Sequence, residues 1–580
     1  MTLLFCLLIF STLLGPLKAS SVGYARRAPT SLNWTPCANA PSGSRLECAK
    51  AQVPLDWANS TQGTIDLSVM RLPAKQSRKG GPGVSGLELV MKQGDLLQSQ
   101  LGEDWDVVSW DTRGIGESGP DIKLFASDSE YDAFWSRLQG NKTLSSRGNL
   151  TQSADAEAFT SQVPTFDNFT ISLNEMMVSK NGDKLKHVGT CANVRDLVYL
   201  VDATYGEGFD VNFWGISYGT LLGTYLTQMF PERVGRVILD GVYDAEKHSN
   251  QAPMKWIDTD DLTIDHGLLM WAQACAATPN CYAARQLSNP TPEKVLALFD
   301  QALNTAHAQY NGYVWTVQGQ NNQTAYLDKN NFSWDFIASN IRTALYDQKL
   351  WQILGETIPV IVSLQHNSKE TAQFELKLPF RPQYGILPEY ALDMVNIAIY
   401  CSDTIDPAGE TTEDLFQAFV DAAQKTSKWA GATLAQNMRS HCHRFASRAI
   451  ERLPQKMNKK PKNVVLVIGN TGDPITPYDS ARRVASSEFL GNQSRLIKFN
   501  AVGHGSHALN STCVDNAVKR YVNGEPPSDK GNDEADIVCD VDRTPYGSIP
   551  QEWRSSAVLS TRIKTWARMV AWNTPIPSAR

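Results

Sequence analysis

The sequence predicts an α/β architecture with a largely parallel sheet. Apolar runs such as "VNFW", "RVILD" and "VVLVIG" are typical of buried strands. Helical patterns such as "TLLGTYLTQMF" lie between them, and this alternation implies crossover connections between parallel strands. At 580 residues, with 42% hydrophobic and 20% charged residues, the chain is long enough for one large core and an inserted cap.

The expected elements follow one another in chain order. "GTIDLSVMRLPA", "DWDVVSW", "VNFWGISYG" and "RVGRVILDGV" predict four strands, and "CANVRDLVYLVDATYG" predicts a helix before the third. From about Asp244 to Arg452 the pattern is helical; in "TPEKVLALFDQAL", Thr291 suits the cap and Pro292 the first turn. "VVLVIG" then returns the chain to a buried strand. We therefore expect a signal peptide (1–19), an N-terminal core (20–243), a helical cap (244–452) and a C-terminal core (453–580).

The amino terminus predicts export. "MTLLFCLLIFSTLLGPLKAS" has an apolar run from Leu3 to Leu14 and small residues at Ala19 and Ser20, although no Lys or Arg precedes the run. The run is too short for a membrane anchor, and the net charge of -6 gives no sign of a nucleic-acid surface. We expect a secreted protein with no membrane anchor and no nucleic-acid partner. Nine glycosylation sequons agree with this: Asn33, Asn59, Asn141, Asn149, Asn168, Asn322, Asn331, Asn492 and Asn510.

The cysteines predict disulfides in an oxidising compartment. Of the ten, Cys6 lies in the signal, so an odd number remains and one thiol is left over. Closeness along the chain favours two small loops and one larger one, a further pair would tie the middle region, and other connectivities stay open. The nominated pairs are Cys37 with Cys48, Cys275 with Cys281, Cys401 with Cys442, and Cys513 with Cys539, with Cys191 free.

The stretch "GISYG" raises the question of chemistry. Ser217 lies between two glycines where a strand gives way to a helix, which suits either an ordinary turn or a nucleophile elbow. Asp473 follows one predicted strand and His504 follows the next, giving the order Ser, Asp, His. Taken singly, Asp473 could form a turn and His504 could be a loop residue, and His507 competes as the base. Their joint placement favours a catalytic triad.

Several motifs in one order resemble a known family. They are "RLPA", "GGPGVSG", "LGEDWDVVSWDTRGIGESGP", "FWGISYGTLLGTYLTQMFPERVGRVILDGVYD", "AIYCSD", "GNTGDPITP" and "GHGSH". Over most of the mature chain they are similar to secreted tripeptidyl-aminopeptidase-like (TAP-like) serine hydrolases, relatives of proline iminopeptidases in the α/β-hydrolase superfamily. The resemblance implies an α/β-hydrolase fold without a cofactor, with Ser217 as nucleophile, His504 as base and Asp473 as its carboxylate. It also implies release of short peptides from N-termini.

The oxyanion hole is the doubtful part of this site. The Tyr218 amide suits one donor, and Gly80 or Gly81 suits the second, by the resemblance. Yet "RLPAKQSRKGGPG" is polar and basic where relatives lead into this turn with an apolar strand. The sheet could be rebuilt with other residues, the protein could be damaged, or the sequence could reflect an incorrect gene model. We favour the last, because the other motifs are intact.

Other signals are weaker. "HCHR" (441–444) resembles a metal cluster, but Cys442 is the expected disulfide partner and no metal site is predicted. "GIGESG" is expected to be a turn rather than a dinucleotide fingerprint. Asp403 is the acidic residue to test first for recognition of a free amine, although a structural role beside Cys401 is the stronger interpretation.

Two rival functions stay open. An elbow and a triad specify acyl transfer but not the acyl group, so an esterase or amidase acting on another small acyl substrate is one alternative. A catalytically silent hydrolase-like binding protein is the other. The sequence does not fix the oligomeric state.

Overall fold

The computed structural model describes residues 31–74, 86–135, 148–256, 262–309, 315–318, 324–327, 334–363, 389–406, 409–425, 427, 438–453, 456–507, 509–525 and 535–547. The expected signal peptide, Gly80, Gly81, Asn141, Asn322 and Asn331 lie outside these residues.

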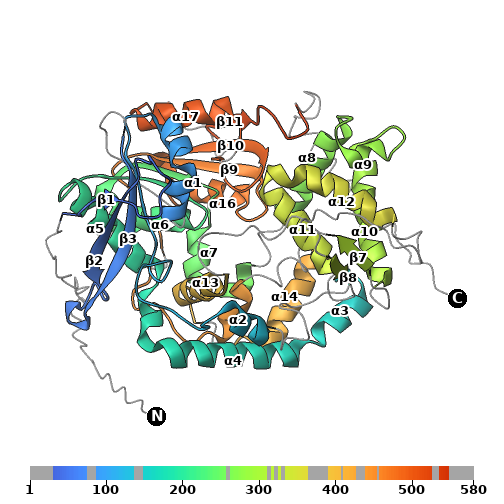
Figure 1. Ribbon diagram of the computed structural model, residues 1–580, viewed down its shortest axis with the longest axis horizontal. Helices are drawn as coiled ribbons and strands as arrows, with labels where there is room; N and C mark the ends of the chain where they lie inside the picture. Colours follow the sequence, from blue (N-terminus) through green and yellow to red (C-terminus); the bar gives the residue numbers. More distant parts are fainter. Residues whose placement is uncertain are drawn as a thin grey trace, which may run out of the picture.

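Two sheets form the centre of the described fold (Figure 1). The first is antiparallel, in the order β1 (Thr35–Pro36), β2 (Glu47–Pro54), β3 (Thr64–Leu72), β4 (Val107–Trp110). The second is parallel throughout, in the order β11 (Ile537–Asp540), β10 (Ser494–Val502), β9 (Val465–Gly472), β6 (Val234–Asp240), β5 (Val211–Ile216). Every strand expected from the apolar runs is present.

Helices cover both faces of the sheets. Successive strand residues point to opposite faces, so Phe213 packs into one hydrophobic cluster and Trp214 into the other. The first cluster includes α5 (Thr190–Tyr205), α6 (Tyr218–Met229) and α16 (Tyr478–Ala485), and the second includes α1 (Gly86–Leu101) and α17 (Thr512–Val522). Because both faces are covered, the parallel strands are apolar on both sides. This is the three-layer arrangement of an α/β-hydrolase fold.

A large helical insertion separates β6 from β9 in the chain. Its elements are α7 (Ala245–Asn250), η4 (Pro253–Trp256), α8 (Leu262–Ala276), α9 (Tyr282–Arg285), α10 (Pro292–Gln309), β7 (Trp315–Gln318), β8 (Thr324–Leu327), α11 (Trp334–Tyr346), η5 (Gln348–Leu350), α12 (Trp351–Ser363), α13 (Glu389–Asp403), α14 (Thr412–Lys425) and η6 (Met438–Arg444). The sequence predicted its helices but not the β7–β8 hairpin. The short elements η1 (Ser60–Gln62), η3 (Pro231–Arg233) and η7 (Gly491–Gln493) lie in connections elsewhere.

The insertion packs as two hydrophobic groups. Residues of α8 to α12 form one cluster (Figure 1, right). Residues of α13, α14 and η6 form the other, together with helices that precede β5 in the chain. Those helices are α2 (Asp128–Trp135), α3 (Ser153–Thr160), α4 (Val163–Asn181) and η2 (Gly182–His187). The helical layer therefore also draws on residues before 244, while the predicted domain boundaries stay predictions.

The two sheets are divided between β4 and β5. In the sequence, the segment before Gly80 has no apolar run for a strand. Among the described residues, β4 pairs with β3 and β5 pairs with β6, and no described strand joins β4 to β5. Residues 75–85, which precede α1, lie outside the described residues. Among the described strands, the five-stranded sheet is the largely parallel sheet that the sequence predicted, and β1 to β4 form the antiparallel one.

Four disulfides join the described cysteines: Cys37–Cys48, Cys275–Cys281, Cys401–Cys442 and Cys513–Cys539. These are the pairs that the sequence nominated. Cys191 is free and buried in α5, as expected.

Candidate active site

Ser217 lies on a sharp turn between β5 and α6. Its φ of 55° and ψ of -120° are uncommon for a residue other than glycine, and such strain often marks a functional position. A Cβ at Gly215 would lie 2.2 Å from the Gly219 carbonyl oxygen, so a larger residue does not fit there. At Gly219 itself the nearest atom would be 4.0 Å away. The turn formed by "GISYG" (215–219) is therefore a strand-to-helix elbow with Ser217 at its tip.

Asp473 and His504 meet at the carboxyl ends of β9 and β10. His504 Nδ1 lies 3.0 Å from each carboxylate oxygen of Asp473. Because an ionised carboxylate accepts only, Nδ1 carries the proton and Nε2 is left as an acceptor. Both side chains are buried. The sequence placed these two residues at neighbouring strand ends, and the structure brings them together.

The Asp473 carboxylate is held by its own turn. The backbone amides of Ile475 and Thr476 each donate to Oδ1 at 2.9 Å, and the Gly505 amide donates to Oδ2 at 3.1 Å. The Thr476 hydroxyl donates to Oδ2 at 2.7 Å and lies 3.2 Å from His504 Nδ1. Burial alone would raise the pKa of Asp473, but the attraction of His504 and these hydrogen bonds hold that pKa below its usual value. The carboxylate therefore stays ionised beside the imidazole.

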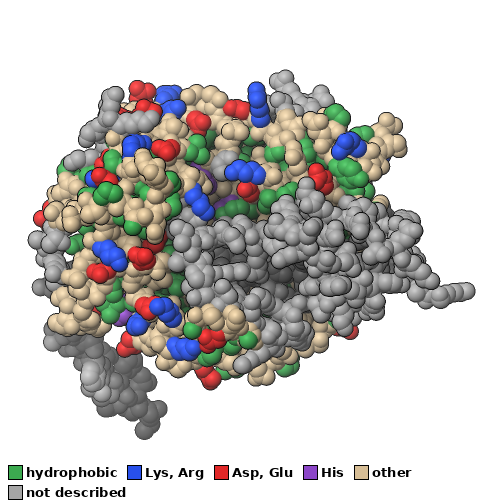
Figure 2. All heavy atoms as spheres, in the orientation of Figure 1, with side chains coloured by type: hydrophobic (Ala, Val, Ile, Leu, Met, Phe, Trp, Pro, Cys, Tyr) green, Lys and Arg blue, Asp and Glu red, His purple; other side chains and the backbone are tan. Residues whose placement is uncertain are grey.

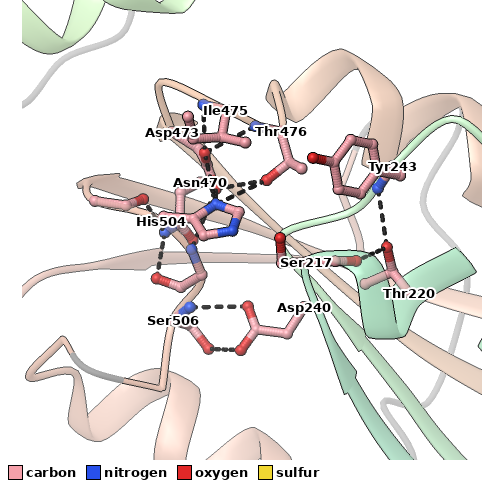
Figure 3. Close-up of polar contacts among 12 residues, drawn as sticks. Ser217, Thr220, Asp240, Tyr243, Asn470, Asp473, Ile475, Thr476, His504 and Ser506 are labelled. Atoms are coloured by element: carbon pink, nitrogen blue, oxygen red, sulfur yellow. Dashed lines mark hydrogen bonds and ion pairs between the residues drawn. The ribbon is translucent and has the colours of Figure 1, made fainter. Parts of the chain in front are cut away.

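The Ser217 hydroxyl points toward the imidazole of His504 (Figure 3). Histidine side chains are also visible in a hollow of the molecular surface (Figure 2). Ser217, His504 and Asp473 thus lie in the spatial order that general-base activation of a nucleophile requires.

His507 does not take the place of His504. The structure gives Asp473 its hydrogen bonds with His504, and none of its described bonds goes to His507. Burial, His504 and Lys349 lower the pKa of His507 to about 4. His507 therefore fits a neutral neighbour of the base.

Asp240 lies at the end of β6, beside both Ser217 and the loop that carries His504 (Figure 3). Its backbone carbonyl accepts from the Ser217 amide at 3.1 Å. Its carboxylate accepts from the amide and the hydroxyl of Ser506, each at 2.8 Å. Burial raises the pKa of Asp240 to about 6, against the opposing effects of Ser506, Trp214 and His504.

Tyr218, the first expected oxyanion donor, lies at a helix N-terminus. Tyr218 is the first residue of α6, and the amides of a first helical turn have no partner within their own helix. The positive end of the helix dipole would favour negative charge there. The second donors, Gly80 and Gly81, lie outside the described residues.

Asp403 has a structural environment rather than an open one. It is buried, one oxygen accepts from the Thr190 amide at 2.9 Å, and the other contacts the Thr190 hydroxyl and lies 3.4 Å from His248 Nε2. The Thr190 hydroxyl lies 2.9 Å from that of Tyr218. Asp403 thus joins α13 to α5 next to the elbow, as the structural interpretation expected.

The "HCHR" segment lies in η6 and serves packing. His443 Nε2 lies 2.8 Å from the Thr412 hydroxyl, the Arg444 Nε donates to Asp167 at 2.8 Å, and the ring of His441 packs near Phe166. Within the part of the chain that the structure describes, no three His, Cys, Asp or Glu side chains group as metal ligands would. Cys442 forms the disulfide with Cys401.

Six predicted glycosylation sites are described. Asn33, Asn59, Asn168, Asn492 and Asn510 are exposed, and Asn149 is half-buried. In the same described residues, no helix has both the length and the apolar character needed to cross a bilayer.

Residues 427–535, which include Asp473 and His504, match the model of a family described as TAP-like protein. This part of the chain is similar to TAP-like proteins. The resemblance found in the sequence is thereby confirmed, and the matched residues contribute two of the three side chains at the candidate site.

Relatives extend this similarity along most of the chain. A serine protease named Hip1 from Mycobacterium tuberculosis is 25% identical over 533 residues, covering 87% of this chain and 92% of the relative. A tripeptidyl aminopeptidase from Streptomyces coelicolor is 24% identical over 560 residues, covering 91% and 89%. One from Streptomyces lividans is also 24% identical and covers 91% and 90%. The names of these relatives support a serine hydrolase, and the chain has the α/β-hydrolase fold.

Sequence reasoning did not find several residues that surround the site: Asn470, Thr476, Asp240, Ser506, Tyr346 and Gln348. Asp240 had a usable signal: like Asp473, it is an acidic residue at the end of an apolar run. Tyr346 and Gln348 had none, because they meet the end of β10 and the His504 loop only through tertiary packing: the Tyr346 carbonyl accepts from the His504 amide, and the Gln348 side chain donates to the Val502 carbonyl.

Proposed function

We propose that this protein is a secreted serine peptidase that releases short peptides from the N-termini of polypeptides through an acyl-enzyme. The observation that carries the proposal is the pairing of His504 with a buried, ionised Asp473, facing a serine on a strained elbow. The names of the TAP-like relatives support the peptide substrate and the position of cleavage.

The geometry supports a two-step reaction. His504 Nε2 takes the proton of the Ser217 hydroxyl as Oγ attacks the scissile carbonyl, while Asp473 fixes the ring and stabilises the imidazolium. The Tyr218 amide donates to the oxyanion. His504 then gives its proton to the leaving amine, the C–N bond breaks, and an ester to Ser217 remains. Water attacks this ester with His504 again as base, which releases the peptide acid and restores Ser217.

A fluorophosphonate probe tests the nucleophile. An activated serine reacts with the probe and an inert serine does not, so we expect labelling of the wild type and none of Ser217→Ala. His504→Ala is expected to lower hydrolysis on the order of 10⁴-fold or more. A folded wild-type protein that does not label would contradict the proposal.

The substrate class needs a separate comparison. We expect a tripeptide anilide with a free α-amine to be hydrolysed faster than its N-acetylated counterpart and faster than a short acyl ester. Equal turnover of the blocked peptide would exclude aminopeptidase selectivity, and preference for the ester would favour the esterase or amidase alternative.

One observation favours a silent protein as a second candidate. Among the described residues, β4 and β5 belong to two separate sheets. A Ser217 that labels slowly in a folded chain, with no turnover of either substrate, would support this candidate.

The export prediction has its own test. We expect the full chain, expressed in a eukaryotic secretory host, to reach the medium and to lose mass on treatment with peptide N-glycosidase. Retention inside the cell with no glycan would contradict it.

A further inference from the structure

The loop that carries His504 is held from the sheet side by polar side chains. The Asn470 amide group donates to the carbonyls of Gly503 and Gly505, at 2.9 and 2.7 Å. Asp240 accepts from Ser506 on the same side. These contacts fix the loop relative to β9 and β6. The opposite side of the loop makes different contacts.

The opposite side is contacted by the helical insertion. The His504 amide donates to the Tyr346 carbonyl at 3.0 Å. Tyr346 ends α11, and the last carbonyls of a helix have no partner within their own helix. The insertion therefore supplies a backbone acceptor for the proposed base itself.

The side chain of Tyr346 also meets the imidazole. The two ring centroids are 4.8 Å apart and the ring planes are inclined by 37°. An aromatic face next to an imidazole limits its rotation and attracts the ring when it becomes a cation. The negative end of the α11 dipole acts in the same direction. Both effects favour the imidazolium that forms when His504 accepts the serine proton.

A second contact joins Gln348, two residues after Tyr346, to Val502, two residues before His504. Gln348 is buried, and its side-chain amide donates to the Val502 carbonyl at 2.7 Å. Val502 is the last residue of β10, directly before the histidine loop. Tyr346 and Gln348 thus hold the end of β10 and the loop that follows at two points.

We propose that Tyr346 and Gln348 of the helical insertion are positioning residues for His504, so that the insertion sets turnover as well as access to the site. This proposal rests on the proposed function, because it assumes that His504 is the base. For the proposed reaction, the imidazole has to keep Nδ1 on Asp473 while Nε2 faces Ser217, and a shift of its backbone would disturb this alignment. Neither residue touches the reacting atoms in this arrangement.

We call the contacts of Tyr346 and Gln348 with the end of β10 and the histidine loop the clamp. Three variants and one control test it. Tyr346→Leu removes the ring, Tyr346→Phe keeps it, and Gln348→Met keeps the bulk of the side chain but removes the donor. Ile341→Val trims a buried residue of the same helix, α11, and controls for general destabilisation. Thermal unfolding of each variant shows which ones are folded at the assay temperature.

We expect Tyr346→Leu and Gln348→Met to lower kcat and the rate of fluorophosphonate labelling by about 10- to 100-fold, with KM unchanged. Tyr346→Phe and Ile341→Val should stay close to the wild type. Unchanged labelling in both damaging variants, or a raised KM with kcat intact, would overturn the proposal; the latter result would assign these residues to substrate contact.

A measurement without catalysis separates this proposal from the proposed function. Hydrogen exchange of the peptide containing residues 499–507 should be faster in Gln348→Met than in the wild type, and unchanged in Ile341→Val. If the wild type fails to label but exchange responds in this way, the proposed function fails and the clamp stands as a structural feature. If the wild type labels and exchange does not respond, the clamp is wrong.

Discussion

Asp240 and Ser506 are joined by two hydrogen bonds, in which the amide and the hydroxyl of Ser506 donate to separate carboxylate oxygens at 2.8 Å each. The same aspartate accepts from the Ser217 amide through its backbone carbonyl. One residue at the end of β6 therefore connects the serine elbow to the histidine loop. Its state of charge matters for both.

The pH dependence of activity follows from this relationship. Burial raises the pKa of Asp240 to about 6, so the carboxylate accepts both bonds above that pH. Below it the group is protonated, one oxygen becomes a donor, and a bond from Ser506 is lost. Activity should therefore depend on the charge of Asp240 in addition to the proton transfer at the proposed base.

We expect kcat/KM of the wild type to fall on the acid side more steeply than a single protonation allows. Asp240→Asn should show a one-proton fall and a maximum about tenfold lower, because its amide cannot accept from Ser506 at both atoms. The check is a profile of kcat/KM from about pH 4 to 8 for both proteins. Parallel acid limbs would remove Asp240 from this role.

The elbow makes a prediction with a matched control: Gly215 and Gly219 are four residues apart in the chain but differ in the space around them. Gly215→Ala would bring a Cβ to 2.2 Å from the backbone oxygen of Gly219, which no rotamer relieves. Gly219→Ala has no atom nearer than 4.0 Å. We expect Gly215→Ala to abolish labelling of Ser217 or to prevent folding, whereas Gly219→Ala should fold and label. Equal behaviour of the two variants would contradict the elbow geometry.

The sequence predicted the parts of this site whose signals are local. Buried parallel strands read as apolar runs, so β5, β6, β9 and β10 were expected, and the residues that end them followed from strand-end placement. Thr476, three residues after Asp473, would need the turn geometry to be known before its hydroxyl could be assigned. A local pattern carries no such geometry.

Contacts between distant segments could not be predicted in this way. Tyr346 contacts His504 although more than a hundred residues separate them in the chain, and no periodicity or motif predicts this contact. The packing of α3 and α4 with α14 likewise joins segments that β5 and β6 separate in the sequence. Long-range packing of an insertion depends on the fit of its whole apolar surface, which local periodicity does not encode.

A buried ion pair provides a prediction about stability. The Arg113 guanidinium donates to both oxygens of Asp196, at 2.7 and 2.9 Å, and to the carbonyls of Pro54 and Leu55. Both side chains are fully buried. Removing one partner leaves the other charge buried and unpaired, so Arg113→Met should lower the free energy of unfolding by about 3 to 5 kcal/mol.

The exposed pair Arg482–Asp479 serves as the control for that measurement. Arg482→Ala should change the free energy of unfolding by less than about 1 kcal/mol. Urea unfolding followed by tryptophan fluorescence measures both variants. A loss in Arg113→Met no larger than in Arg482→Ala would show that the buried pair contributes little.

The free thiol makes a chemical prediction. Cys191 is buried in α5, and burial raises the pKa of its thiol, so it is protonated and inaccessible in the folded protein. We expect a thiol reagent to modify the native protein very slowly and to modify one thiol per chain after unfolding without reductant. A non-reducing peptide map should show the same four disulfides, and Cys191 in a bridge would refute the assignment.

The division between β4 and β5 gives the last prediction. Unpaired backbone groups buried along these strands would each cost on the order of 1 to 3 kcal/mol, so a stable active enzyme should have a strand between them. If the gene model is incorrect, the transcript will contain additional codons between Ala74 and Val84 that encode an apolar run. The encoded protein should then label at Ser217 faster and unfold at higher temperature than the present chain. A transcript without extra codons, together with an equally stable and active chain of 580 residues, would show that the two sheets function as they stand.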